Sequence, residues 1–152
     1  MKVFNLIMLI TILTGTVYSQ NISDMDILEK EVLETIKEWN QTFDQNNPEA
    51  YFNHIHDDLS LFIASSPYRI DGKSDDREEF EWSLKSGRTR VSLFQELQLK
   101  VQILSETSAL VTYHTRGIYG SEGQEHITYL KETNVLIKED NEWKIVHIHV
   151  SK

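Results

Sequence analysis

The sequence predicts an α+β domain in which three helices are followed by a strongly curved antiparallel meander sheet and pack on it. Through most of residues 23–84, apolar residues recur every three to four positions, which is the period of an α-helix. From residue 89 onward they alternate with polar residues, which is the period of a strand. Short loops separate these later segments, and strands joined by short loops are antiparallel neighbours. Helices that precede a run of strands are typical of the α+β class.

The three expected helices cover residues 23–45, 48–52 and 74–84. In the first, apolar residues at helical spacing are separated by Glu and Lys, so that one side can face a core. Pro48 starts the second helix, at a position where its missing N–H is no loss. Ser74 or Asp75 caps the third helix, and Gly87 closes it.

Strands are expected over residues 59–63, 91–95, 99–104, 109–119, 127–138 and 143–150. Strands of eleven or twelve residues do not stay flat, because each strand carries a right-handed twist. A long sheet that curls around a helix forms a cone, and a cone of this kind usually contains a pocket. We therefore expect a pocket between the sheet and the helices.

The first 19 residues have the features of a secretory signal peptide. Lys2 gives a short positive start, and residues 3–13 are almost wholly apolar. Residues 17–19 suit a signal peptidase, so that cleavage is expected near Ser19-Gln20. The apolar run is too short for a transmembrane helix. We expect a secreted or periplasmic protein that is not inserted in a membrane after cleavage, with one domain over residues 20–152.

Composition excludes several classes of function. The chain has 15 Lys and Arg against 24 Asp and Glu, a net charge of −9, which disfavours binding to nucleic acid or to an anionic membrane. It has no cysteine, so disulfides, thiolate metal sites, cysteine nucleophiles and a lipobox anchor are excluded. No nucleophile elbow, phosphate loop or dinucleotide fingerprint is present, and we expect no cofactor.

Four strings of residues carry a resemblance to a known family. They are Asn-Pro-Glu-Ala-Tyr (47–51), Asp-Asp-Leu-Ser-Leu-Phe (57–62), Glu-Thr-Asn-Val (132–135) and the closing segment 141–151, with its Trp-x-Ile-Val-His-x-His pattern. Together they resemble the association domain of calcium/calmodulin-dependent protein kinase II. That domain is a member of the nuclear transport factor 2-like superfamily, with the SnoaL-like polyketide cyclases and ketosteroid isomerase. The likeness covers essentially the whole of residues 20–152.

The resemblance implies a cone-shaped fold, dimers formed through the sheet, and in the kinase version rings of stacked dimers. It also implies a deep pocket whose arginines accept small carboxylates. The positions of those arginines correspond to Thr115, Asn134 and Val150 in this chain, none of which is basic. Arg116 is one residue away, and a bulge would bring it inward. A tyrosine at the pocket edge corresponds to Tyr51.

Alternation along the later strands assigns side chains to the two faces of the sheet. On the final strand one face has Val146, Ile148 and Val150, and the other has Ile145, His147 and His149. The resemblance directs Ile148 and Val150 to the pocket, together with Tyr113, Thr115, Glu132, Asn134 and Leu136. The histidines of the final strand, His114 and Arg116 are then expected on the outer face.

Glu132 is the candidate catalytic residue. In isomerase-like members of the superfamily a carboxyl group in this region of the sheet works beside a tyrosine in an apolar pocket. Desolvation in such a place raises the pKa of a carboxyl group, which can then act as acid or base. Tyr51 and Tyr113 are its expected partners. The alternative is an ordinary ion pair of Glu132 with Arg116 or with a neighbour of Lys131. No convincing second carboxylate is evident, and residues 75–79 resemble a solvated helix start.

Two further ligand-binding candidates are expected at the mouth of the pocket. Arg69 lies where pockets of the superfamily open, after the first strand and before the third helix, and is a candidate cation for an acidic ligand. The alternative is an exposed arginine paired with Asp71 or Asp75. Trp82 is the other candidate, although an aromatic residue on a helix more often packs in the core.

The histidines suggest a metal hypothesis and an alternative to it. His147 and His149 lie on one side of a strand, and His114 on another strand would complete a three-nitrogen zinc site. Residues 54–58, with two histidines and two aspartates on a loop, form a second candidate. The family signature contains the histidine pair without a metal, which favours a role in packing and in the dimer. We therefore expect no metal.

Three functional hypotheses follow. The first, which we favour, is a free-standing, non-catalytic module that forms homodimers, or larger rings, and binds a small organic ligand in the cone. The second is a cofactor-independent isomerase, cyclase or dehydratase in which Glu132 works with a Tyr or His. The third is a purely structural oligomerisation domain. The lack of a clear second carboxylate disfavours the second, and the lack of a fused partner disfavours the third.

Overall fold

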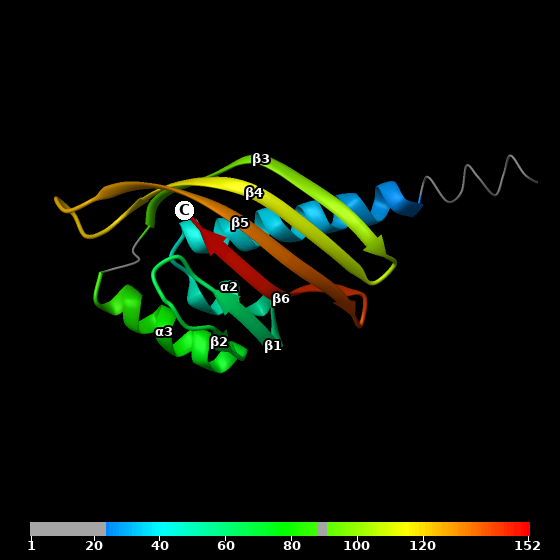
Figure 1. Cartoon of the computed structure of the whole chain (residues 1–152), viewed down its shortest axis with the longest axis horizontal. Helices are drawn as coiled ribbons and strands as arrows, with labels where there is room; N and C mark the ends of the chain where they lie inside the picture. The colour runs from blue at the N-terminus through cyan, green and yellow to red at the C-terminus, as the bar shows by residue number, and fades with distance from the viewer. Residues whose placement is uncertain (1–23, 88–90) are drawn as a thin grey trace, which may run out of the picture.

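The computed structural model describes residues 24–87 and 91–152, and the expected signal peptide, residues 1–19, lies outside this part of the chain. A long helix over residues 24–44 comes first (blue to cyan in Figure 1). The elements that follow are α2 (Pro48–Asn53), β1 (Ile55–Phe62), β2 (Ile70–Asp71), α3 (Lys73–Lys85), β3 (Val91–Ser105), β4 (Ser108–Tyr119), β5 (His126–Glu139) and β6 (Glu142–Ser151). None of the described helices is both long and apolar enough to span a membrane.

The strands form one mixed sheet with the order β2-β1-β6-β5-β4-β3. β3 to β6 are the expected antiparallel meander, but β1 is parallel to β6, so the expectation of a wholly antiparallel sheet is wrong in this detail. The short-loop argument applies to consecutive strands, whereas α3 and four strands separate β1 from β6 along the chain and leave it free to return in the same direction. The two-residue strand β2, paired with β1, was not predicted.

Strand β3 and the start of α3 differ from prediction. The expected strands 91–95 and 99–104 are one strand, β3, whose register with β4 shifts between Leu97 and Lys100, where Gln98 has a positive φ of 57°. The apparent gap is therefore a bulge. At α3 the N-cap is Gly72, with φ 92° and no side-chain hydrogen bond, rather than Ser74 or Asp75.

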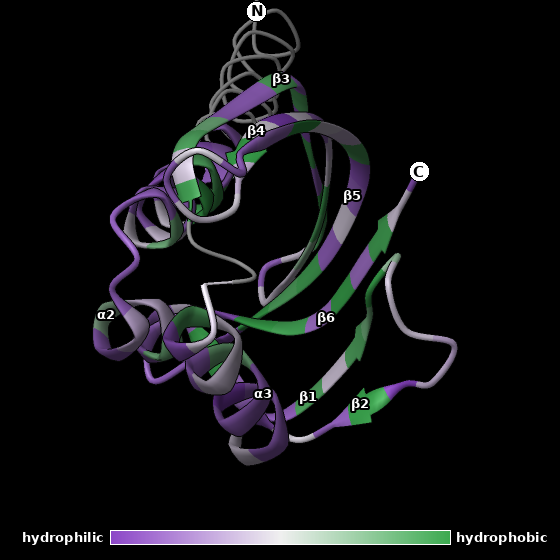
Figure 2. Cartoon of the chain, turned by 90° about the vertical axis from the view of Figure 1, so that its left-hand side faces the viewer, coloured by the Kyte–Doolittle hydropathy of each residue, from purple (hydrophilic) through white to green (hydrophobic). Residues whose placement is uncertain are grey.

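The helices lie on the concave side of the sheet, which bends around them without closing into a barrel (Figures 1 and 2). The long helix contributes Val32, Ile36 and Trp39 to the buried core, and α2 contributes Phe52. The sheet contributes Ala109, Val111, Leu136, Ile145 and Ile148. The apolar side of the long helix and the inward-facing residues of the strands therefore pack together in one core, as the sequence pattern predicted.

A bulge in β6 changes which side chains face that core. Val135 pairs with His147 and Leu136 pairs with Ile145, so Val146 is an extra residue on β6. Ile145 and Ile148 are consequently both buried on the concave side. The prediction that Ile145 shares a face with His147 was wrong, because strict alternation holds only on either side of the bulge.

This bulge can be tested with two substitutions. Ile145→Ala should lower the free energy of unfolding by about 2–5 kcal/mol, because it leaves a cavity in the core. Val146→Ala should lower it by at most about 1 kcal/mol, because Val146 is only partly buried. Urea denaturation of both variants is the measurement. A larger loss for Val146→Ala than for Ile145→Ala would show that β6 alternates without a bulge.

Candidate functional site

A buried hydrogen-bonded group on the concave face of the sheet is centred on Glu132. The Tyr113 hydroxyl donates to Glu132 Oε1 at 2.7 Å. Asn134 Nδ2 donates to the Tyr113 hydroxyl oxygen at 3.1 Å and lies 3.3 Å from Glu132 Oε1. All three side chains are buried, with 8% or less of each exposed. The structure thus brings Glu132 and Tyr113 together, as predicted.

Strand register explains this juxtaposition. Tyr113 lies directly opposite Glu132 in the β4–β5 pair, and Val150 lies opposite Glu132 in the β5–β6 pair. Asn134 is two residues further along β5, so it projects from the same face and pairs with Ile148. The bulge of β6 lies beyond this point and does not disturb it.

Burial controls the charge of Glu132. Desolvation raises the pKa of Glu132 to about 7, although the hydrogen bonds from Tyr113 and Asn134 act in the opposite direction by stabilising the carboxylate. The charge of Glu96 raises this pKa as well. The alternative ion pair is not formed, because Arg116 donates to Gln95 at 2.9 Å. Glu132 can therefore hold or release a proton near neutral pH.

A second buried carboxyl group, Asp76 on α3, was missed by sequence reasoning. Only 6% of Asp76 is exposed, and burial, with a smaller effect of the charge of Glu79, raises its pKa to about 7. The interpretation of residues 75–79 as a solvated helix start was wrong for this residue. The available signal was its spacing, because Asp76 precedes the core residue Phe80 by four positions and so lies on the same side of the helix.

Tyr51 on α2 is within electrostatic reach of both carboxyl groups. Its ring stacks on Phe80, with centroids 4.9 Å apart, and lies 5.1 Å from the ring of Trp39. Burial raises the pKa of the Tyr51 hydroxyl well above its usual value, and the charges of Asp76 and Glu132 raise it further. Tyr51 therefore stays neutral, and the charges of Asp76 on α3 and Glu132 on β5 both act on its hydroxyl group.

The structure groups some predicted ligand-binding residues and separates others. Thr115 and Ile148 are buried with Glu132, and Val150 is partly buried beside it. Arg69 instead forms a two-point ion pair with Asp71, at 2.6 and 3.0 Å, and is exposed, so the alternative holds. Trp82 is 53% exposed on α3. Arg69, Trp82 and Arg116 therefore lie outside the interior group.

The histidine positions do not support the proposed zinc site. His114 lies on β4, whereas His147 and His149 lie on β6, and β5 separates these two strands. Over residues 24–87 and 91–152, no cluster of three or more His, Asp or Glu side chains could hold a metal ion.

The histidines have other partners. His147 Nδ1 is 2.7 Å from the Ser60 hydroxyl, and the His149 ring packs near Phe62. In the second candidate cluster, residues 55–58 lie on β1 rather than on a loop. There His56 pairs with Glu139 at 3.1 Å, and Asp57 pairs with Lys73 at 3.5 Å.

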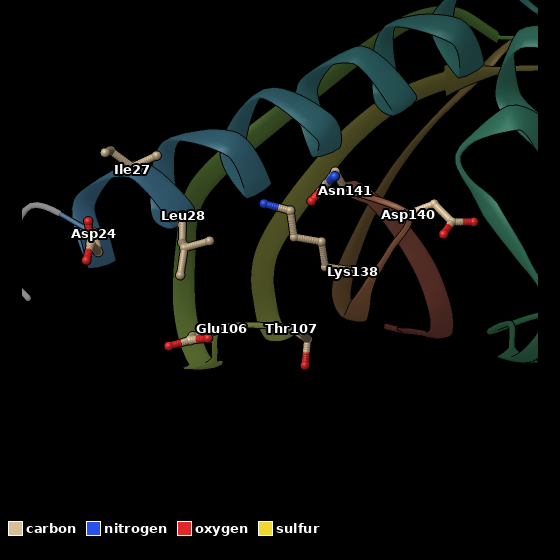
Figure 3. A pocket seen from close by; sticks show the side chains of 8 residues that line it. All are labelled: Asp24, Ile27, Leu28, Glu106, Thr107, Lys138, Asp140 and Asn141. Atoms are coloured by element: carbon tan, nitrogen blue, oxygen red, sulfur yellow. The ribbon is translucent and has the colours of Figure 1, made fainter.

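Two hollows on the described surface bear on the site. The larger, of about 550 Å³, lies beside the first turn of the long helix and the β3–β4 and β5–β6 turns (Figure 3). Its lining residues are Asp24, Ile27, Leu28, Glu106, Thr107, Lys138, Asp140 and Asn141. Glu31 Oε2 accepts hydrogen bonds there from Lys138 Nζ at 2.6 Å and from Trp143 Nε1 at 3.0 Å. This hollow does not include Glu132.

The second hollow, of about 410 Å³, adjoins the interior group. It is lined by Lys37, Asn40, Gln41, Asp44, Phe94, Gln95, Glu96 and Leu97. Asn40 Nδ2 donates to Glu96 at 2.8 Å, and Asn40 Oδ1 lies 3.3 Å from the Tyr113 hydroxyl. Asn40 therefore lies between this surface groove and the Tyr113–Glu132 pair.

The raised pKa of Glu132 predicts a specific dependence of stability on pH. Between pH 4.5 and about 7 the unfolded chain loses the Glu132 proton while the folded chain keeps it, so stability falls as pH rises and then levels off. Glu132→Gln should reduce the loss of unfolding free energy between pH 5 and pH 8 by about 2–3 kcal/mol. Urea denaturation at both pH values measures this loss. An unchanged loss would contradict the assignment, and Glu122→Gln, at an exposed carboxyl group, is the control.

Comparisons with known proteins agree with the fold. A candidate scytalone dehydratase from Novosphingobium aromaticivorans is 18% identical, with a TM-score of 0.74 over 85% of this chain and 86% of that one. An NTF2-like protein of unknown function from Pseudomonas putida is 21% identical, with a TM-score of 0.71 over 81% and 84%. The association domain of C. elegans CaMKII is 20% identical, with a TM-score of 0.67 over 84% and 97%.

No curated protein matches the sequence. A family model does: the calcium/calmodulin dependent protein kinase II association domain matches residues 28–152, nearly all of the described part of the chain. The chain therefore belongs to the calcium/calmodulin-dependent protein kinase II association domain family and has the nuclear transport factor 2-like fold.

Proposed function

We propose that this protein is a self-associating module that binds a small organic molecule in the concave interior of its sheet. The observation that carries the proposal is the buried group of Glu132, Tyr113 and Asn134, together with the buried Asp76 on α3. Burying carboxyl groups without cations is unfavourable, and apolar residues in their place would serve a purely structural core better. Groups of this kind, with strongly shifted pKa values, are concentrated at functional sites.

Ligand binding can be tested with a thermal-shift panel of small carboxylates, enones, polycyclic aromatics and amines. A ligand at a hundred times its dissociation constant adds about 2.7 kcal/mol to stability, a shift of several degrees for a domain of this size. We expect at least one such shift, and we expect Tyr113→Phe to abolish it. Tyr129→Phe, at an exposed tyrosine of the same sheet, is the matched control. Shifts that Tyr113→Phe leaves unchanged would contradict an interior site.

Self-association is proposed to use the outer face of the sheet. The family is one of association domains, and the outer face exposes apolar side chains on several strands, namely Phe62, Leu97, Ile127 and Tyr129. His147 and His149 lie on the same face, as predicted. Dimers and larger rings are both compatible with this surface.

The self-association proposal predicts the effect of a charge at the centre of that face. Thr133 pairs with Thr112 on β4 and with His149 on β6, so its side chain projects outward between them. Thr133→Arg should convert the dimer or ring to monomers in sedimentation equilibrium. Ser74→Arg, on the exposed side of α3, should leave the assembly intact. A wild-type chain that is monomeric at micromolar concentration would rule out the proposed assembly.

An acid–base enzyme is the second candidate, and Asp76 is the observation that favours it. Two carboxyl groups on separate elements, each with a pKa of about 7, can exchange protons with a bound substrate at neutral pH. One structurally similar protein is a candidate scytalone dehydratase. Incubating each compound that binds with the protein and analysing the products distinguishes a binding module from an isomerase, cyclase or dehydratase.

Export is proposed as well, on the strength of the apolar segment 3–13 and the residues that follow it. The intact mass of protein recovered from the medium or periplasm should correspond to a chain that starts near Gln20. A mass that includes residues 1–19 would contradict processing.

A further inference from the structure

The hydroxyl group of Tyr113 has one proton and two acceptors within reach. Its oxygen lies 2.7 Å from Glu132 Oε1 and 3.3 Å from Asn40 Oδ1, and all three side chains are buried. Asn134 Nδ2 donates to the same hydroxyl oxygen at 3.1 Å, so the proton of Tyr113 points away from Asn134. A tyrosine hydroxyl donates one hydrogen bond, so at any moment Tyr113 donates either to Glu132 or to Asn40.

Glu96 fixes which end of the Asn40 amide faces Tyr113. Asn40 Nδ2 donates to Glu96 Oε1 at 2.8 Å, and an ionised carboxyl group can only accept hydrogen bonds. The nitrogen of the Asn40 amide is therefore held by Glu96, and its oxygen is presented to the Tyr113 hydroxyl. Glu96 is half-buried on β3 and lines the 410 Å³ groove, so Asn40 has one contact in the groove and one in the interior.

The charge of Glu132 decides which acceptor the Tyr113 hydroxyl uses. An ionised carboxyl group is the stronger acceptor, and the short distance of 2.7 Å to Glu132 Oε1 is typical of a charge-assisted hydrogen bond. When Glu132 Oε1 takes up a proton, the new O–H group can donate to the Tyr113 oxygen, and the Tyr113 proton then turns to Asn40 Oδ1. The turn is a rotation about the C–O bond of Tyr113, and both protons have an acceptor after it.

We propose that Asn40 is a positioning residue for Glu132, because it accepts a hydrogen bond from Tyr113 when Glu132 is protonated and loses it when Glu132 is ionised. An amide whose oxygen accepts a hydrogen bond donates more strongly through its nitrogen, so the charge of Glu132 is coupled to the Asn40–Glu96 contact. Coupling is reciprocal, and a molecule that binds Glu96 in the groove therefore changes the proton affinity of Glu132. This inference rests on the proposed function for the use that is made of Glu132, and it specifies how that site is regulated.

The other ionisable groups of this region define the controls. Those of the interior and the groove are Lys37 and Asp44 on the long helix, Tyr51 on α2, Asp76 on α3, Glu96 on β3, and Tyr113 and Tyr119 on β4. Burial raises the pKa of the three tyrosines, which therefore stay neutral. The charge of Glu96 raises the pKa of Glu132. Asp76 has a pKa of about 7 as well, so its titration has to be separated from that of Glu132.

The side-chain amide of Asn40 gives the most direct test. In a pH titration of ¹⁵N-labelled protein through the Glu132 midpoint, near pH 7, the Asn40 Nδ2 resonance should move with the Glu132 carboxyl resonance. The movement should be lost in Tyr113→Phe and in Glu132→Gln, and it should remain in Asp76→Asn. The exposed side-chain amide of Asn141 is the control and should not follow Glu132. An Asn40 resonance that does not follow Glu132, or that still follows it in Tyr113→Phe, would overturn the proposal.

Removing the second acceptor should change the midpoint of Glu132 itself. Asn40→Leu keeps the size of the side chain but leaves the Tyr113 proton without an acceptor when Glu132 is protonated, so the midpoint should fall by about one pH unit. Tyr113→Phe should raise the midpoint, because the hydrogen bond from Tyr113 stabilises the carboxylate. Adding Asn40→Leu to Tyr113→Phe should then have little effect. An equal fall in both backgrounds would contradict coupling through the Tyr113 hydroxyl. If Asn40→Leu does not fold, the Asn40 resonance of the wild-type chain decides.

The link to the groove has its own variant. Glu96→Gln imitates a ligand that neutralises Glu96, and it should lower the midpoint of Glu132, because the charge of Glu96 raises it. Glu122→Gln, at an exposed carboxyl group, should leave the midpoint unchanged. A midpoint that Glu96→Gln does not alter would overturn the regulation of Glu132 from the groove.

The coupling and the proposed binding function fail separately. The titration of Asn40 needs no ligand, so coupling observed without any hit in the thermal-shift panel would support the role of Asn40 and overturn the binding function. A Tyr113-dependent ligand found while the Asn40 amide does not follow Glu132 would overturn the role of Asn40 and leave the binding function in place.

Discussion

The hydrogen bond between Tyr113 and Glu132 joins β4 and β5 where the concave interior is polar. Its position follows from the β4–β5 register, and its consequences extend through Asn134 to the sheet and through Asn40 to the long helix. Because this group is buried beside the apolar core, the Glu132 carboxyl group keeps a proton that an exposed glutamate would lose. Tyr113 and Asn134 form hydrogen bonds to this carboxyl group, which is neutral or carries a single negative charge.

Asp76 extends this polarity to the helical side. α3 presents Asp76 and Phe80 on one face, and the Tyr51 ring stacks on Phe80. The resemblance to kinase association domains implied a pocket with arginines for carboxylates, at positions that here are Thr115, Asn134 and Val150. Two of these contribute unpaired oxygens, and no cation replaces the missing ones in the described interior. The fold is thus that of the family, while the positions that the resemblance assigns to arginines carry neutral side chains here.

Much of the fold and part of the site could be predicted from the sequence, because both depend on the regular spacing of apolar residues along helices and strands. Apolar residues at helical spacing located the long helix. Alternation sorted the strand residues into two faces, and the resemblance indicated that Tyr113, Thr115, Glu132 and Asn134 face inward. Alternation failed at Ile145 because a bulge inserts one residue, and no composition signal marks that insertion. Asp76 was missed because its run of charged neighbours resembles a solvated helix end. Arg69, Trp82 and Arg116 were assigned to the site by analogy, and local ion pairs and exposure place them elsewhere.

The central claim is that Glu132 is neutral or only partly ionised at physiological pH because it is buried with Tyr113 and Asn134. The most direct measurement is a pH titration of the ¹³C resonance of the Glu132 carboxyl group, assigned by its loss in Glu132→Gln. A midpoint near 7 is predicted. A midpoint near 4.5, the ordinary value for a solvated glutamate, would contradict the account.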